Sequence, residues 1–362
     1  MNANRPQLII LLVLLVAGIG TLVIVDQVRQ DPGPCNAAGS SASRIERLSA
    51  SDAGNATAVQ SAIDRTAARG GGTVQLSEGH FDIDRPLVLK SNVALKGSGP
   101  NTLLKASSRF LKSTGPLGGH PLITTNGAEN VTIANLTADQ SGDVFDGNVS
   151  GRLKEYLIDV RHSDNALVEQ VATKNPFTYS IAVVASSNFC VKNNSTVVRS
   201  NGQYDQLDGI HVTDSHSGLV VGNHVDQRQG KDGDDGLVAQ TIGSPVYDIV
   251  YRENDVRGGS HGAGMQLAVS GQEIYNISIE DNRFWGSPSG IRTGYYDGGS
   301  QLVHDVTVKG NQFVDMDGLS TNFAGELENI QVVDNHFCRS GDFKVADGPG
   351  NHVAGNQSSC QG

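Results

Sequence analysis

An asparagine recurs at nearly regular intervals along the second half of the chain, and this repeat limits the possible folds more than any other feature. Each of these asparagines follows an apolar residue by three positions, as in LVVGNHV, SIEDNRF and TVKGNQF. The asparagines are Asn194, Asn223, Asn254, Asn282, Asn311, Asn335 and Asn356. Their apolar partners are Val191, Val220, Tyr251, Ile279, Val308, Val332 and Val353. A repeat of roughly 20–30 residues, built from short strands, predicts a solenoid whose coils bury their apolar faces by stacking.

The pattern within the repeat favours an all-β, right-handed parallel β-helix over other solenoids. The chain lacks the Leu-x-x-Leu-x-Leu consensus of leucine-rich repeats, and propeller blades are longer than these units. The 44 glycines and the aromatic content of only 5% suit many short strands joined by turns. Asparagine tolerates a left-handed turn conformation, and its side chain can bond to the equivalent asparagine of the next coil. We therefore expect an asparagine ladder along the solenoid.

One amphipathic helix is expected ahead of the repeat, over residues 55–69. Val59, Ile63 and Ala67 recur at helical spacing, Asp52 or Asn55 can cap the start, and the glycines at 70–72 can end it. We expect this helix to cover the N-terminal edge of the solenoid, which would otherwise accept another strand. The expected organisation is an N-terminal segment at 1–25, a linker at 26–50 and a β-helix domain at 51–362.

The N-terminus predicts export. Residues 8–25 are 18 uncharged, mainly apolar residues, which is near the lower limit for a helix that spans a bilayer. Because no convincing small-x-small cleavage site follows, we expect an uncleaved transmembrane signal anchor, with a cleaved signal peptide as the alternative. Either reading places the body outside the cytoplasm, anchored to the membrane or secreted.

Cysteine usage and charge fit that compartment. The four cysteines are Cys35, Cys190, Cys338 and Cys360, and we expect Cys338 to pair with Cys360. Cys190 could instead be a small buried apolar residue. A net charge of −11 disfavours nucleic acid as a partner. The sequence carries no nucleotide, flavin or haem motif and no strong oligomerisation signal, so we expect a monomer without an organic cofactor.

The first part of the domain resembles the opening of pectin-lyase-like β-helix proteins. It shows a capping helix, then GGGTV, then the run LKSNVALKGSG. The resemblance covers about residues 52–360 and implies a right-handed parallel β-helix. It does not fix the reaction, because this fold carries hydrolases, lyases, epimerases and non-catalytic adhesins.

Candidate catalytic residues recur at coil spacing. Asp208 lies in LDGIHV, Asp234 and Asp235 in GDDGLVA, His261 in GSHGAGMQLAV, and Arg292 in GIRTG. Each step from one of these motifs to the next is close to the length of one coil. Taken singly, Asp-Gly is a common turn sequence, His261 a surface histidine and Arg292 a solvated cation. Together, their order resembles glycoside hydrolase family 28, the polygalacturonases and their relatives.

This resemblance implies roles for the matching positions. Asp234 resembles the general acid, Asp208 and Asp235 the pair that activates water, His261 the residue that sets protonation, and Arg292 a sugar ligand. The implied mechanism is inverting, for which the carboxyl groups of acid and base are expected roughly 6.5–9.5 Å apart. Three carboxylates in one cleft cannot all ionise cheaply, so one is expected to hold a proton.

The chain departs from the family pattern at the last motif. It reads Arg292-Thr293-Gly294, so the family's lysine, which contacts the galacturonate carboxylate, is missing. This leaves a substituted, alternating or neutral glycan open as the substrate, with Lys231 or Arg228 as compensating cations. His211 and Tyr295 are further candidates for binding substrate in the groove.

Two other functions remain open. A polysaccharide lyase or uronate epimerase would need the substrate charge neutralised by Ca²⁺ or basic residues, together with a base. In that case Asp232, Asp234 and Asp235 could bind Ca²⁺, with Arg228, Lys231 or Arg292 nearby. A hydrolase would need no metal. The third possibility is a non-catalytic, glycan-binding surface protein.

Overall fold

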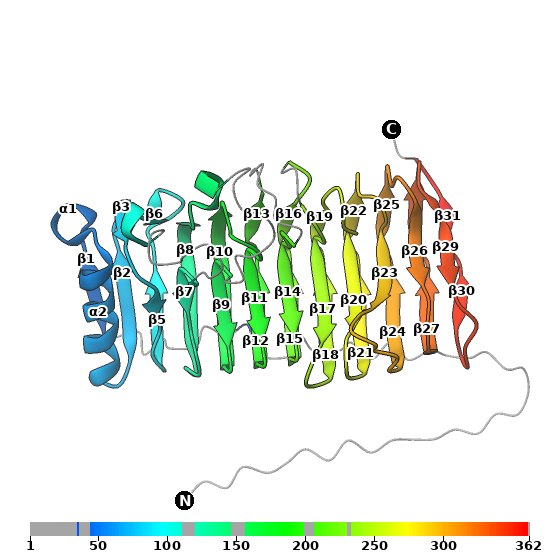
Figure 1. Cartoon of the computed structure of the whole chain (residues 1–362), viewed down its shortest axis with the longest axis horizontal. Coiled ribbons are helices and arrows are strands. Elements are labelled where there is room, and N and C mark those ends of the chain that lie inside the picture. The colour runs from blue at the N-terminus through cyan, green and yellow to red at the C-terminus, as the bar shows by residue number, and fades with distance from the viewer. Residues whose placement is uncertain are drawn as a thin grey trace, which may run out of the picture. The chain divides into compact units, whose positions relative to one another are not determined.

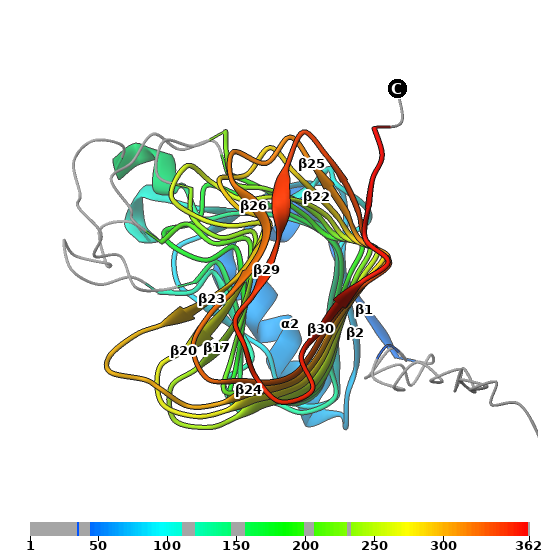
Figure 2. The same ribbon diagram turned by 90° about the vertical axis from the view of Figure 1, so that its right-hand side faces the viewer.

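The computed structural model describes Cys35 and residues 44–110, 120–145, 156–198, 206–229 and 233–360. These residues form coils that stack along one axis (Figure 1), and each coil runs around a common interior (Figure 2), which buried apolar side chains fill. Strands of successive coils pair in parallel and build a 21-stranded and a 10-stranded sheet. The expected all-β parallel β-helix is confirmed.

The ten-stranded sheet contributes one strand to each coil from β4 onward. Its strands are β4 (Leu87–Val88), β7 (Ile123–Thr124), β9 (Ile158–Arg161), β11 (Ile181–Val184), β14 (Ile210–Thr213), β17 (Leu237–Thr241), β20 (Met265–Val269), β23 (Ile291–Tyr295), β26 (Leu319–Phe323) and β29 (Gly341–Val345). Inward side chains stack from coil to coil and are fully buried, as in the column Ile158, Ile181, Ile210, Leu237, Met265 and Ile291. Because side chains alternate along a strand, the neighbouring positions face outward.

The larger sheet supplies the other sides of each coil. Its strands are β1 (Ile45–Leu48), β2 (Gly72–Leu76), β3 (Gly79–Ile83), β5 (Val93–Lys96), β6 (Thr102–Ala106), β8 (Val131–Asp139), β10 (Asp164–Lys174), β12 (Ser187–Lys192), β13 (Ser195–Val197), β15 (His216–Val221), β16 (His224–Asp226), β18 (Val246–Arg252), β19 (Asp255–Arg257), β21 (Ile274–Glu280), β22 (Arg283–Trp285), β24 (Val303–Lys309), β25 (Gln312–Val314), β27 (Leu327–Val333), β28 (His336–Cys338), β30 (His352–Ala354) and β31 (Gln357–Ser358). A 3₁₀ helix, η2, covers Gly142–Phe145.

The asparagine ladder is confirmed. The side-chain oxygen of Asn254, for example, accepts hydrogen bonds from the backbone N–H and the amide of Asn223, at 3.0 and 2.9 Å. Its own amide donates to the Val220 carbonyl and to Asn282 Oδ1, both at 2.9 Å. The same pattern links Asn194 to Asn356 through every intervening repeat. Each ladder asparagine therefore forms hydrogen bonds both with backbone groups of the neighbouring coils and with the side chain of the next asparagine.

The expected left-handed conformation lies one residue earlier than predicted. The residues with positive φ directly precede the ladder asparagines; they are Asn193, Gly222, Glu253, Asp281, Gly310, Asp334 and Gly355. The preceding residue makes the turn, so the asparagine itself keeps a backbone conformation that directs its amide along the solenoid axis. Asn, Asp and Gly at six of these seven positions are the residue types that tolerate this conformation.

The N-terminal cap is also confirmed. Helix α2 (Ala56–Ala68) begins at Asn55, whose side chain accepts the Ala58 N–H at 3.0 Å, and packs on strands β1 to β5. A four-residue helix, α1 (Ala50–Ala53), precedes it. Strand β1, however, lies within the stretch predicted as linker and pairs in parallel with β2. Its four residues, IERL, were too short to stand out from a linker in the sequence.

Two disulfides join the cysteines. Cys338 pairs with Cys360, as expected, and Cys35 pairs with Cys190. Cys190 lies on the outside of β12 in a small apolar cluster with Leu167 and Leu219, so it is both buried and cross-linked. Among the residues that the structure describes, no helix is long and apolar enough to span a membrane. The predicted anchor at 8–25 lies outside the described residues.

Candidate active site

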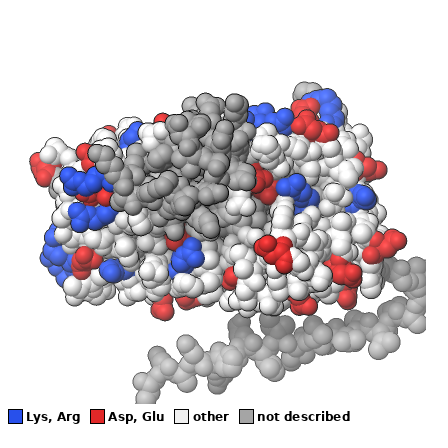
Figure 3. Space-filling view, in the orientation of Figure 1, with Lys and Arg blue, Asp and Glu red and all other residues white. Residues whose placement is uncertain are grey.

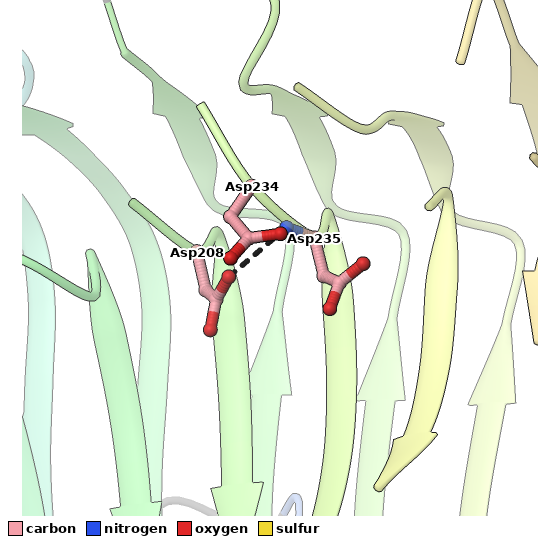
Figure 4. Close-up of side chains that lie close together, drawn as sticks. All are labelled: Asp208, Asp234 and Asp235. Atoms are coloured by element: carbon pink, nitrogen blue, oxygen red, sulfur yellow. Dashed lines mark hydrogen bonds between the residues drawn. The ribbon is translucent and has the colours of Figure 1, made fainter. Parts of the chain in front are cut away.

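The three aspartates of the sequence motifs come together at the start of two neighbouring strands of the ten-stranded sheet (Figure 4). Asp208 precedes β14, whereas Asp234 and Asp235 precede β17. One carboxylate oxygen from each residue lies within 4.8 Å of the others.

A one-residue shift in register explains why two aspartates face one. Leu207 bridges Gly233, whereas Ile210 pairs with Leu237. Between these two pairs the coil that carries β17 therefore has one more residue than the coil that carries β14, as in a β-bulge. Both Asp234 and Asp235 fall opposite Asp208 as a result.

Asp208 is buried and uses both carboxylate oxygens. Oδ1 accepts the Asp235 backbone N–H at 3.0 Å, and Oδ2 lies 2.7 Å from His211 Nδ1. Burial raises the pKa of Asp208 to about 7, although the Asp235 N–H and the charge of Arg292 oppose the rise. This carboxyl group can therefore carry a proton near neutral pH.

His211 is the partner of Asp208 and is equally buried. Its Nε2 lies 2.9 Å from Gln240 Oε1, and its ring stacks on Tyr179 with centroids 4.1 Å apart. Burial lowers the pKa of His211 to about 4, so the imidazole is neutral at pH 7. Because the Gln240 amide nitrogen donates to Ser270, its oxygen faces the imidazole and accepts Nε2–H. Nδ1 then lacks a proton, and the hydrogen between it and Asp208 belongs to the carboxyl group.

This assignment predicts that Asp208→Asn stabilises the protein at alkaline pH. An aspartate normally titrates near pH 4, so between about pH 4 and 7 the folded state holds a proton that the unfolded state releases. Asp208 alone would therefore make stability fall across that range. Below about pH 6.5 the lowered pKa of His211 opposes this fall, so the difference in stability between Asp208→Asn and wild type isolates the Asp208 contribution. The asparagine amide mimics the neutral acid and donates to His211 Nδ1, so we expect a gain of roughly 1–3 kcal/mol at pH 8. Urea unfolding at pH 5 and pH 8 measures it.

The opposite result would identify a different charge state. If Asp208→Asn lowers stability at pH 8, the pair is an aspartate ion bonded to a protonated His211. Asp281→Asn, at an exposed turn of the other sheet, is the matched control and should leave the pH dependence unchanged.

Asp235 is buried against a cation. Its Oδ1 accepts the Ala263 N–H at 2.6 Å and lies 3.2 Å from Arg292 Nη2. Burial, followed by the charges of Asp208 and Asp234, raises its pKa well above the usual range, and Arg292 opposes this rise. Asp208 and Asp235 therefore cannot both be ionised without a large cost. Asp234 is the more exposed member of the cluster.

These residues line a cavity of about 120 Å³. Its wall includes the three aspartates, His211 and Arg292, and it is completed by Tyr179, Gln206, Val238, Gln240, Gln266, Ala268 and Tyr296. Gln266 connects two of these groups, because its oxygen accepts Arg292 Nε at 2.6 Å and its amide donates to the Tyr296 hydroxyl at 2.7 Å. The pocket thus combines acids, a fixed cation and amide donors, as sugar-binding sites require.

His261 is not part of this cavity. Strands β17 and β20 pair with Leu237 opposite Met265. Counting back from this pair, the neighbour of Asp235 in the next coil is Ala263, and His261 falls two residues earlier, exposed in the turn before β20. Within the cavity, the imidazole beside the acids is that of His211.

Three other predicted ligands lie elsewhere or outside the described residues. Arg228 follows β16 of the larger sheet and binds the Gly286 carbonyl at 2.6 Å and Asp317 at 3.0 Å. Tyr295 packs against the core, whereas the next residue, Tyr296, lines the cavity, since successive side chains alternate. Lys231 lies outside the described residues, as does Asp232.

The donors around the acids do not suit Ca²⁺. Both oxygens of Asp208 and Oδ1 of Asp235 are engaged by N–H groups or by His211 and Arg292. Calcium takes six to eight oxygen ligands, and the lining supplies few besides these carboxylates. Arg292 already supplies a positive charge beside the Asp235 carboxylate, where a bound cation would otherwise lie. The cluster fits proton transfer better than metal binding.

Sequence reasoning missed Tyr179, Gln240 and Gln266. Ile181 pairs with Ile210, so counting back one coil from Asp208 reaches Tyr179. Gln266 is opposite Val238 in the outward register of β17 and β20, and Gln240 is the next outward position of β17. The alternation of outward positions could have identified the glutamines, had the strand offsets been known.

Known proteins share the fold and, more distantly, the sequence. The model of the right-handed β-helix region family matches residues 122–313. A mannuronan C5-epimerase, AlgE5, of Azotobacter vinelandii is 26% identical over 272 residues, which are 70% of this chain and 24% of that protein. Alginate lyase 7 of the same organism is 30% identical over 189 residues, 49% of this chain and 21% of that protein. The chain thus spans less than a quarter of the length of either relative.

Solved structures agree on the architecture. A hyperthermoactive exopolygalacturonase from Thermotoga maritima superposes with a TM-score of 0.65 at 18% identity, and the match covers 81% of each chain. At this identity the likeness establishes the pectin-lyase-like fold and leaves the chemistry to the residues of the groove.

Proposed function

The chain belongs to the right-handed β-helix family, and from that premise we propose that its carboxylate cavity is the active site of an enzyme that cleaves an acidic polysaccharide. The observation that supports this proposal most is the convergence of Asp208, Asp234 and Asp235 in one cavity beside Arg292. Turn aspartates have no reason to meet in this way, and burying carboxyl groups is costly unless they are used or paired. Relatives named as an epimerase and a lyase of acidic glycans support the same substrate class.

In the proposed reaction, the more exposed Asp234 donates a proton to the glycosidic oxygen. As the glycosidic C–O bond breaks and water attacks the anomeric carbon, Asp235, which Arg292 favours in its ionised form, accepts the proton from the water. Asp208, which keeps its proton, holds the Asp235 backbone N–H and so positions this base. His211 keeps the Asp208 proton in place, and Arg292 binds the sugar next to the cleaved bond. We propose that water attacks directly and inverts the anomeric centre, because the motifs resemble those of glycoside hydrolase family 28. The stereochemistry of the first product tests this step.

The test incubates the purified chain with polygalacturonate, rhamnogalacturonan, alginate and neutral glycans. New reducing ends without absorbance from unsaturated sugars identify a hydrolase, and NMR of the first anomer formed shows inversion or retention. Retention would overturn direct attack by water. The absence of turnover on every glycan would favour a non-catalytic glycan-binding protein.

A lyase or uronate epimerase is the second candidate. The names of the two curated relatives favour it. Proton abstraction beside a carboxylate needs a base and a neutralising cation, which Asp235 or neutral His211 and Arg292 would supply. Unsaturated products, or inverted C5 without cleavage, would establish this reaction in the same assays.

We propose that the enzyme works outside the cytoplasm, because two disulfides persist in an oxidising compartment. The membrane anchor at 8–25 and the monomeric state remain part of this proposal. A net charge of −11 again argues against nucleic acid as the polymer bound.

A further inference from the structure

A second group of charged residues lies on the face that carries the carboxylate cavity. Strand β9 presents Asp159 and Arg161 outward, and Arg161 Nε donates to Asp159 Oδ2 at 3.0 Å. Asp159 is 3% exposed and also accepts a hydrogen bond from Thr124 at 3.4 Å. The Arg161 side chain keeps 31% of its surface exposed, and its guanidinium lies 5.7 Å from the centre of the Tyr156 ring. Arg161 is thus a cation held in a fixed place at the surface.

This group is aligned with the cavity. Asp159 is in register with Ala182 and His211, and Arg161 with Val184 and Thr213. Two strand steps, about 10 Å, separate β9 from β14, and a third step, about 14 Å in all, reaches β17, which Asp234 and Asp235 precede. A stack of rings spans the same two steps: Tyr156 lies on Tyr179 at 4.7 Å, and Tyr179 lies on His211 at 4.1 Å. A ligand that continues from the cavity toward the N-terminus along this sheet passes Arg161.

The outward positions on β11, the strand between them, carry no charged or bulky side chain. On β11 they are Ala182 and Val184, which are small and uncharged. Where side chains are drawn in colour on this face, basic ones are more frequent toward the N-terminal end and acidic ones toward the C-terminal end (Figure 3). The N-terminal side of the cavity is therefore the side that favours a polyanion.

We propose that Arg161 forms a distal subsite that binds the carboxylate of a uronic acid residue several sugar units from the bond that reacts. This inference rests on the proposed function and deepens it by giving the substrate a charge at a defined position. Arg292, the cation at the cavity, is already bonded to Asp235, and the aspartate cluster itself repels a polyanion. Arg161 offers a planar set of donors that suits a carboxylate, and Asp159 together with Tyr156 sets its orientation.

The experiment measures kcat/KM on polygalacturonate and mannuronate oligomers of two to eight units, with the full chain. For the wild type, kcat/KM should rise once the oligomer is long enough to reach Arg161. Arg161→Gln should remove that rise, roughly a tenfold loss on long oligomers, and leave the shortest substrates unchanged.

Arg161→Gln alone leaves Asp159 buried without its cation and could destabilise the fold. Asp159→Asn/Arg161→Gln removes both charges with little change in shape and is the decisive variant. If this double variant folds and keeps the full dependence on length, Arg161 has only a structural role and the subsite is overturned. Arg252→Gln is the matched control, because its side chain is 27% exposed on the other sheet.

A failure of the proposed enzymatic function can be distinguished from a failure of the subsite. If the wild type turns over no oligomer, calorimetry with a hexamer of galacturonate or mannuronate decides the subsite separately. Binding that is lost in the double variant and kept in Arg252→Gln supports the subsite. Equal binding by all three proteins, or none by the wild type, overturns it.

Discussion

Asp234→Asn is expected to lower kcat by about 10²- to 10⁴-fold, the usual contribution of a general acid. The asparagine keeps the shape of the side chain and removes the proton that the leaving oxygen needs. Because Asp234 is the more exposed of the three aspartates, the fold should remain intact and KM should change little. Steady-state kinetics on the polysaccharide that the wild type turns over fastest measure the effect.

Asp281→Asn serves as the control for the removal of one charge. It lies in an exposed turn of the larger sheet, at the position before a ladder asparagine, where Asn193 already occupies the equivalent place. We expect its activity to match the wild type. An Asp234→Asn enzyme with more than a tenth of wild-type kcat would remove Asp234 from the role of acid and move that role to Asp208 or Asp235, whose pKa values are raised.

Asn254→Ala is expected to lower the free energy of unfolding by about 3–5 kcal/mol. The substitution removes four buried hydrogen bonds, two accepted from Asn223 and one donated to each of Val220 and Asn282. The groups left behind cannot reach water, so each costs more than the bond it loses. Urea unfolding followed by circular dichroism gives the change in midpoint and slope.

Asn356→Ala is the matched substitution at the C-terminal end of the ladder. It removes comparable bonds to Asn335 and Val332, but Asn356 is half-buried and water can replace them. We expect less than half the effect of Asn254→Ala. Equal losses at the two positions would mean that burial adds nothing to the ladder.

The repeat could be predicted from the sequence because each of its key positions requires one type of residue. A ladder asparagine must bond above and below, and the apolar residue three positions earlier must fill the interior, so both recur in the sequence. All but the last of these apolar residues are buried, and Val353 is 44% exposed in the final coil. The left-handed residue was misplaced by one position, because Asn, Asp and Gly all tolerate that turn and the neighbours compete for it.

The candidate site was harder to predict from the sequence, because it depends on the pairing register between strands of successive coils. Down one inward column, Ile210 pairs with Leu237, Leu237 with Met265, and Met265 with Ile291, so no two of these three steps have the same length. A single extra residue places both Asp234 and Asp235 opposite Asp208, and the offset of the next coil places Ala263, and not His261, beside Asp235. The lengths of the loops at the corners set the number of residues from one coil to the next. The residue types in the strands do not reveal these lengths.

The Cys35–Cys190 disulfide changes how the molecule carries mechanical load. The bond joins cysteines 155 residues apart, closes a loop that contains the cap helix and the first coils, and fastens the chain at Cys35 to β12. Tension applied to the chain before residue 35 passes directly through the two sulfurs into β12, midway along the solenoid. The coils between Cys35 and Cys190 lie outside that path, so pulling at the N-terminus cannot peel the cap from the end. Under oxidising conditions traction on the N-terminus therefore loads β12 first, and reduction of the disulfide moves that load to β1, the first strand.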